Sequence, residues 1–148
     1  MLHFNRKTEY ALLALEHMAH SDGFKASTRE ISETQRIPYP VLAKIMQLLA
    51  NRGLIKSVQG TKGGYLLAKD PNDITVENIV HIFEGPVAVA ECFKEEKISC
   101  PQWDGCLIKG PFSELNRKIH RLLAQTTVSQ LMEQPAPRTE LPTYKESQ

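Results

Sequence analysis

The chain has no run of 18 consecutive apolar residues, and its first residues lack the apolar core and small-residue cleavage site of a secretory signal. The first absence excludes a membrane-spanning helix and a membrane partner, and the second favours a cytoplasmic location. Cysteine is scarce, with three in 148 residues. Three thiols cannot all pair within one chain, and a reducing cytoplasm disfavours disulfides, so we expect the cysteines to have another role.

Acidic residues are missing from a long stretch of the chain. The range 36–69 contains six Lys and Arg and no Asp or Glu, although the net charge of the whole chain is only +1. Because a carboxylate would repel phosphate, an acid-free basic segment is typical of a surface that binds a polyanion. A basic face that is merely solvated is the alternative interpretation.

The apolar spacing predicts a mainly α-helical protein with one small β-hairpin. Helices are expected at 6–20, at 28–34 and from about 39 to 52, and short strands at 54–58 and 65–67. The loop between the strands, 59–64, contains three glycines, which favours a hairpin. This order of elements is that of a winged helix-turn-helix, which places its third helix in the major groove of double-stranded DNA and its hairpin along the backbone or minor groove. We assign this domain to residues 1–85.

The third predicted helix has an apolar side and a polar side. The apolar stripe that we expect to face the core consists of Val41, Leu42, Ile45, Leu48 and Leu49. On the polar side, side chains that suit base edges or thymine methyl groups are Pro40, Ala43, Lys44 and Gln47. The starts of two helices supply phosphate contacts through Thr28 and Tyr39, and the hairpin supplies Gln59 and Lys62.

The second half of the chain divides into three parts after a fourth helix that begins near Thr75. Residues 86–111 form a loop-rich insert, and residues 112–131 form a long helix with apolar residues spaced by three and four. One chain offers little to cover that stripe, so we expect it to pack against a second copy in a homodimer. Residues 132–148 are polar and proline-rich, which predicts a disordered tail.

The insert holds all three cysteines, Cys92, Cys100 and Cys106. Thiolates are soft ligands that suit zinc, copper(I) or an iron–sulfur cluster. The tight Cys-x2-4-Cys pair of structural zinc sites is missing, and the wider spacing favours a cluster, 2Fe–2S or 4Fe–4S. Three unrelated thiols are the alternative. Three ligands leave a fourth position open, for which His81, His120 and the carboxylate of Glu9 are candidates.

Several segments together resemble the Rrf2 (Rrf-two) family of bacterial transcription regulators. The resemblance spans roughly residues 4–130 and rests on the three-cysteine insert and on the segments 8–12 (TEYAL), 53–57 (GLIKS), 63–68 (GGYLLA) and 73–76 (DITV). It implies a homodimeric winged-helix regulator, acting as a repressor, whose cysteines bind an iron–sulfur cluster. Family members sense nitric oxide, iron supply, redox state or cluster demand, and loss or damage of the cluster changes their affinity for promoters.

Two positions distinguish branches of that family. The cluster-biogenesis branch has a His three residues after the third Cys, where this chain has Lys109. The nitric-oxide-sensing branch, like NsrR, uses an acidic residue near the start of the first helix, donated from the partner subunit, and Glu9 stands at that position. The iron-responsive branch, like RirA, does without one. The cysteine spacing occurs in both of these last two branches.

Other classes of function fit less well. The chain has no Cys-x2-Cys motif and no evident Cys–His or paired-carboxylate arrangement, so an enzyme is not expected. A winged-helix module stabilised by zinc, or a regulator that uses its bare thiols without a cluster, remains as an alternative.

Overall fold

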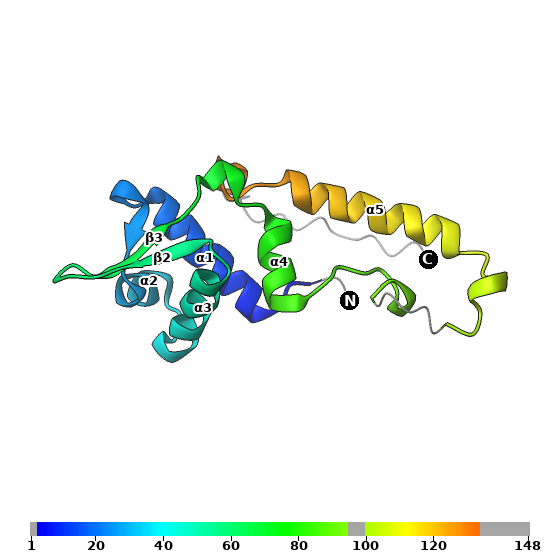
Figure 1. Ribbon diagram of the computed structural model, residues 1–148, viewed down its shortest axis with the longest axis horizontal. Helices are drawn as coiled ribbons and strands as arrows, with labels where there is room; N and C mark the ends of the chain where they lie inside the picture. The colour runs from blue at the N-terminus through cyan, green and yellow to red at the C-terminus, as the bar shows by residue number, and fades with distance from the viewer. Residues whose placement is uncertain (1–2, 95–99, 134–148) are drawn as a thin grey trace, which may run out of the picture.

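Six α-helices and a three-stranded sheet are formed within residues 3–94 and 100–133, the part of the chain that the computed structural model describes. The helices are α1 (Arg6–His20), α2 (Thr28–Gln35), α3 (Tyr39–Asn51), α4 (Val76–Glu84), α5 (Lys109–Gln125) and α6 (Val128–Glu133). The strands are β1 (Lys25–Ala26), β2 (Ile55–Val58) and β3 (Gly64–Leu67). The expected mainly helical fold with a hairpin wing is confirmed. In Figure 1, α1 to α4 and the sheet form one body, and α5 extends from it to one side.

The sheet has the strand order β1-β3-β2, and both pairings are antiparallel. Strands β2 and β3 are the predicted wing, whereas β1 was not predicted, because two residues are too short to show a periodicity of two. Gly64 makes the β1–β3 contact possible. A Cβ atom at this position would lie 2.7 Å from the carbonyl oxygen of Ala26, so the two strands approach more closely than a side chain would allow.

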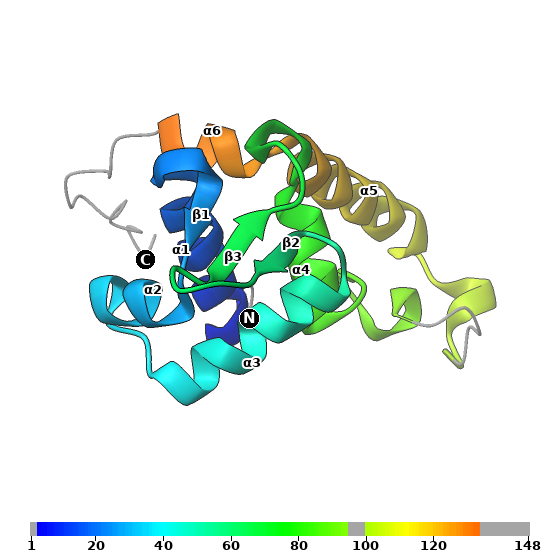
Figure 2. The ribbon, with the colours of Figure 1, turned by 60° about the vertical axis from the view of Figure 1, so that its left-hand side comes forward.

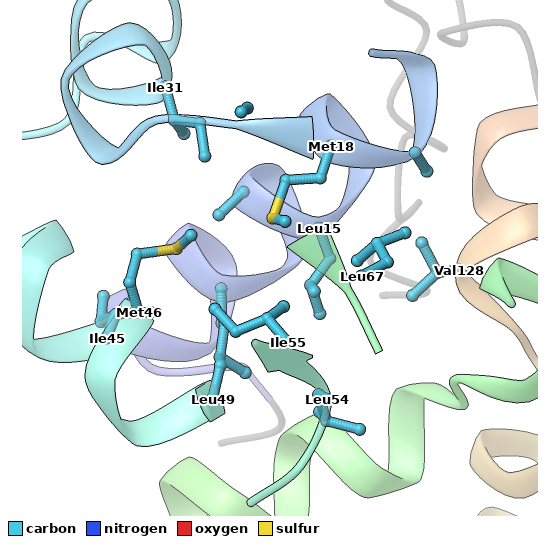
Figure 3. Packing of buried hydrophobic residues seen from close by; sticks show 14 of the residues in the cluster. Leu15, Met18, Ile31, Ile45, Met46, Leu49, Leu54, Ile55, Leu67 and Val128 are labelled. Atoms are coloured by element: carbon cyan, nitrogen blue, oxygen red, sulfur yellow. The ribbon is translucent and has the colours of Figure 1, made fainter. Parts of the chain in front are cut away.

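The core lies where α1 crosses α3, the sheet and α6. Figure 3 shows the buried side chains of Leu15, Met18, Leu49, Ile55 and Val128 gathered in this region, from four helices or strands that are distant in sequence. Helix α1 contacts α2, α3, α4 and α6, so it is packed on more than one side.

The inward stripe of α3 differs from the predicted one. Val41 is exposed, and Met46 is fully buried. Leu42, Ile45 and Leu49 are buried as expected. Val41 lies on the outer side of the first turn, next to the fully buried Leu42, and the flexible side chain of Met46 takes a place in the core instead.

The long helix expected at 112–131 is two helices. Helix α5 begins at Lys109 and ends at Gln125, and α6 follows after a two-residue break. A capping box starts α6: the Thr127 amide donates to Gln130 Oε1 (3.0 Å), and the Gln130 amide donates to Thr127 Oγ1 (3.2 Å). The sequence T-x-x-Q at 127–130 is typical of a helix start, and our prediction of one continuous helix missed it.

The break returns the chain to the winged-helix body. The Val76 amide donates to the Thr126 carbonyl, and the Val128 amide donates to the Ile74 carbonyl, each at 2.8 Å. Val128 is then buried in the core beside α1 (Figure 3). The expected disordered tail at 132–148 starts within α6, and residues 134–148 lie outside the described part of the chain.

Helix α5 keeps its apolar face uncovered. None of its residues is buried, and the Leu122 side chain is 65% exposed. Leu115 and Ile108 at its start are exposed as well. Across the described residues, every helix is too short or too polar to cross a membrane.

Candidate functional site

The outward face of α3 carries the polar side chains that were predicted to read DNA. Pro40, Lys44 and Gln47 are exposed, and Ala43 is half-buried. Among the described residues, Lys44 has no ion pair, so its ammonium is available to an anion. Figure 2 shows α3 on the lower edge of the body, with the wing beside it. The structure therefore presents these four residues on one open surface.

Two further predicted contacts lie at helix starts. Thr28 is the first residue of α2, where Ser27 is the N-cap and accepts from the Glu30 amide at 3.1 Å. Because Ser27 already provides this cap, the hydroxyl of Thr28 has no partner within the described residues and is available to a phosphate. Tyr39 begins α3, and its amide is one of the four that no helical carbonyl reaches.

The wing brings Gln59 and Lys62 to an exposed loop between β2 and β3. Gly60 has a φ of 127°, a conformation that favours glycine, so the loop depends on this residue. The Lys62 side chain has no partner within the described part of the chain, so its ammonium group is available to a DNA phosphate.

Two contacts that hold the helix-turn-helix together were not predicted. The guanidinium of Arg29 on α2 lies 5.6 Å from the centre of the Tyr39 ring on α3, a cation–π contact across the turn. His17 on α1, with a side chain only 13% exposed, is near Glu30 Oε1 (3.2 Å) and Gln35 Nε2 (3.4 Å) on α2. A neutral imidazole satisfies both partners, donating to Glu30 and accepting from Gln35. Both contacts join residues distant in sequence, so spacing carried no signal for them.

The three cysteines are half-buried and free of disulfides. Cys100 Sγ donates to Gln102 Oε1 at 3.4 Å. Three soft thiol donors suit a cluster chemically. Within residues 3–94 and 100–133, however, no three ligating side chains lie close enough together to hold a metal ion. The thiols are thus chemically suited to an iron–sulfur cluster, but the conformation of the insert in one chain does not bring the three sulfur atoms together.

An aromatic contact joins two segments of the insert. Phe93, beside the first cysteine, meets Trp103 edge to face with 6.4 Å between ring centres. The ammonium of Lys109 lies 4.4 Å from the centre of the Trp103 ring and donates to the Trp103 carbonyl at 3.1 Å. The segment around Cys92 is thus held against the segment between Cys100 and Cys106 without any metal. Lys109 is engaged in this contact.

The insert is also attached to α5 and α4 through its first residues. His120 on α5 lies 2.8 Å from the Val87 carbonyl through Nε2 and 2.7 Å from Glu77 Oε1 on α4 through Nδ1. The Val89 amide donates to Asn116 Oδ1 at 3.0 Å. Both partners of His120 are acceptors, so both bonds form only when the ring carries two protons. In one chain both ring nitrogens of His120 thus lie against hydrogen-bond acceptors, and the side chain of His81 is exposed.

Glu9 lies in the first turn of α1, where its carboxylate pairs with Arg6 at 2.9 Å and is 45% exposed. Figure 1 places α1 in the winged-helix body and the cysteine insert beyond the far end of α4. Within one chain, Glu9 belongs to no group of three ligating residues in the described part. A negative charge in a first helical turn also interacts favourably with the helix dipole.

An exposed recognition helix, a hairpin wing and an acid-free basic segment define a winged helix-turn-helix DNA-binding protein. The chain belongs to the Rrf2 family, described as iron-dependent transcriptional regulators, whose model matches residues 4–134. It is 32% identical over 126 residues to the HTH-type transcriptional regulator NsrR of Shouchella clausii, covering 84% of this chain and 85% of that one. It is also 32% identical over 127 residues to the regulator IscR of Serratia proteamaculans, covering 85% and 76% of the two chains.

The fold agrees with this relationship. The structure of CymR (YrzC), the global cysteine regulator of B. subtilis, superposes with a TM-score of 0.71 at 27% identity, over 89% of this chain and 97% of that one. These relatives are transcriptional regulators and not enzymes.

Proposed function

We propose that this protein is a DNA-binding repressor whose affinity for promoters is switched by an iron–sulfur cluster bound to Cys92, Cys100 and Cys106. The observation that carries the proposal is the insert itself: three free thiols lie on one segment that is hydrogen-bonded directly to α5. The similarity to NsrR and IscR supports it, because both are regulators of the same family.

The chain provides a continuous path from the thiols to the DNA-reading face. The insert contacts α5 through Val87 and Val89, and α5 leads into α6, whose Val128 lies in the core beside α1. Helix α1 in turn packs on α3, the recognition helix. A change in the insert therefore reaches α3 through packed elements and no flexible linker.

A second copy of the chain completes the proposed sensor. Leu115 and Leu122 of α5 are exposed in one chain, as in a helix that pairs with a second copy. Two copies would present two recognition helices to successive major grooves, about 34–36 Å apart. Glu9 is proposed as the fourth ligand, donated by the other copy, as the resemblance to the nitric-oxide-sensing branch implies. In one chain its carboxylate is 45% exposed and pairs with Arg6.

When bound, the cluster supplies a group that reacts with nitric oxide or oxidants and that is lost when iron is scarce. The residues of this chain have separate roles around it. The thiols would hold the group, the Phe93–Trp103–Lys109 contact keeps two segments of the insert together, and His120 fixes the insert to α5. DNA is read by α3, the two helix starts and the wing.

A thiol-based regulator without a cluster is the second candidate. The three cysteines do not converge within the described residues, and CymR, a relative in fold, is described as a global cysteine regulator. In that case the oxidation state of the thiols alone would set the affinity for DNA.

An absorption spectrum of protein purified without oxygen, with iron, sulfide and zinc analysis, tests the proposal. We expect a coloured protein whose visible bands are lost in Cys100→Ala and kept in Asp104→Asn, an exposed control in the same insert. The DNA affinity of the coloured form should change when nitric oxide, oxygen or a chelator is added.

The other outcomes each contradict the proposal. Colourless protein with stoichiometric zinc would establish a structural module. Protein that binds neither metal, even after attempted reconstitution, would establish the bare-thiol regulator. A coloured Glu9→Gln variant with an unchanged spectrum would remove Glu9 from the ligand set.

A further inference from the structure

A cleft of about 360 Å³ lies at the junction of the winged-helix body, α4 and α5. Its volume is within the range of about 300–1,000 Å³ that is typical of small-molecule sites. The polar residues that line it are Arg52, Lys69, Glu77, Asn78, His81 and His120. The cleft contains no cysteine and none of the side chains assigned to base or phosphate contacts, although Arg52 and Lys69 belong to the basic segment 36–69. The cluster and DNA-reading proposals therefore give the cleft no role of its own.

The charges around the cleft are not balanced. Glu77 is the only acid among its lining residues, and its carboxylate is engaged by His120 at 2.7 Å. The side chains of Arg52, Lys69 and His81 have no hydrogen bond or ion pair within residues 3–94 and 100–133. Three cationic or protonatable side chains therefore surround one space without a counter-charge, an arrangement that an anion stabilises.

The cleft also offers a further donor and an apolar wall. Asn78 uses its Oδ1 to accept from the Thr75 amide in the capping box of α4, which leaves its amide nitrogen free to donate. Leu54, Ile82 and Val87 line the remaining surface. Convergent donors beside an apolar wall are typical of a site for a small charged molecule with a hydrophobic body.

We propose that this cleft binds a small organic anion, one that carries a carboxylate or phosphate group on a compact apolar body. Arg52 at the end of α3 and His81 on α4 hold the anionic group from two sides, and Val87 and Ile82 contact its apolar part. The site stands whether or not the insert holds a cluster.

Calorimetric titration of the full-length protein with phenyl phosphate tests the site at constant ionic strength. We expect one saturable site per chain, with weaker binding of inorganic phosphate, which lacks the apolar body, and no binding of benzyl alcohol, which lacks the charge. Arg52→Gln removes a charge-assisted hydrogen bond and should weaken binding about tenfold, and His81→Gln removes one hydrogen-bonding ring and should weaken binding to a smaller extent. Lys118→Gln, an exposed cation on α5 outside the cleft, is the matched control and should have no effect.

Phosphate groups can also come from DNA, so the same variants are titrated with non-specific duplex DNA by fluorescence anisotropy. We expect Arg52→Gln and His81→Gln to bind duplex DNA as the unmodified chain does, whereas Lys62→Ala binds it more weakly. The proposal is overturned if phenyl phosphate shows no saturable binding, if both variants bind it normally, or if they lose as much DNA affinity as Lys62→Ala. Circular dichroism spectra establish that each variant is folded.

Discussion

The fully buried Thr8 on α1 donates its hydroxyl proton to Glu84 Oε1 at the end of α4, across 2.7 Å. The same carboxylate oxygen accepts from the Asn5 amide at 2.8 Å. Glu84 is the last residue of α4, two positions before the insert begins. These two bonds therefore fix the first turn of α1, which carries Glu9, to the start of the insert.

Replacing Thr8 tests this connection. Thr8→Val keeps the volume of the side chain and removes the donor, so the free energy of unfolding in urea should fall by about 1 kcal/mol. Thr8→Ser keeps the hydroxyl and should lose less. A loss in Thr8→Ser with no loss in Thr8→Val would show that the methyl group of Thr8, and not its bond to Glu84, stabilises the junction.

His120 should hold the insert to α5. His120→Leu leaves the Val87 carbonyl and the Glu77 carboxylate without a donor, so backbone amides near residues 87–90 and along α5 should exchange hydrogen faster, while those of α1 are unchanged. Glu77→Gln retains an acceptor oxygen for Nδ1–H and should have a smaller effect. Uniformly faster exchange across the whole chain would contradict a local role.

The recognition helix should read bases through two side chains. In duplex DNA selected from a random library, Lys44→Ala and Gln47→Ala should each lose about 1–3 kcal/mol of binding free energy and relax the preference at one base position. Asn51→Ala, exposed at the end of the same helix, serves as the control and should bind normally. A loss that is equal on all sequences would mean that Lys44 and Gln47 contact only the backbone.

The wing should tolerate no side chain at Gly64. In Gly64→Ala the new Cβ would lie 2.7 Å from the Ala26 carbonyl oxygen, and the strands must separate, so thermal unfolding should indicate a loss of about 1–3 kcal/mol. Gly110→Ala is the control, a glycine at which an added methyl group meets no neighbouring atom. Nothing lies within 4 Å of a Cβ there, and the residue is helical, so stability should rise by about 0.5–1 kcal/mol.

Glu114 and Arg117 form a two-pronged ion pair on α5, with contacts of 2.6–2.9 Å. The side-chain hydrogen bond from Arg117 holds the pKa of Glu114 below its usual value. A lowered carboxyl pKa contributes stability above the usual pKa, and this contribution is lost as the pH falls through the lowered value. In Arg117→Gln, NMR titration should show the pKa of Glu114 moving back up. An unchanged value would assign the shift to Lys118 and Arg121.

Much of the candidate site followed from local sequence. The acid-free basic segment, the polar side of the third helix and the glycine-rich hairpin loop are all features of neighbouring residues, and the structure places Lys44, Gln47 and Lys62 on open surface as expected. The cysteine insert was visible from composition alone. Its aromatic contact was not, because Phe93 and Trp103 are ten positions apart in a segment without periodicity.

The sequence by itself determined where α1, α2, α3, α4 and the wing form, because helix periodicity, caps and glycine turns act over a few residues. The tertiary structure alone decided which side of α3 faces the core. The way α3 packs against α1 leaves Val41 exposed and buries Met46. It also decided that β1 joins the sheet, that α6 returns to the core, and that His120 bonds α4 and the insert. Each of these depends on pairing between residues far apart in the chain, which local propensity does not encode.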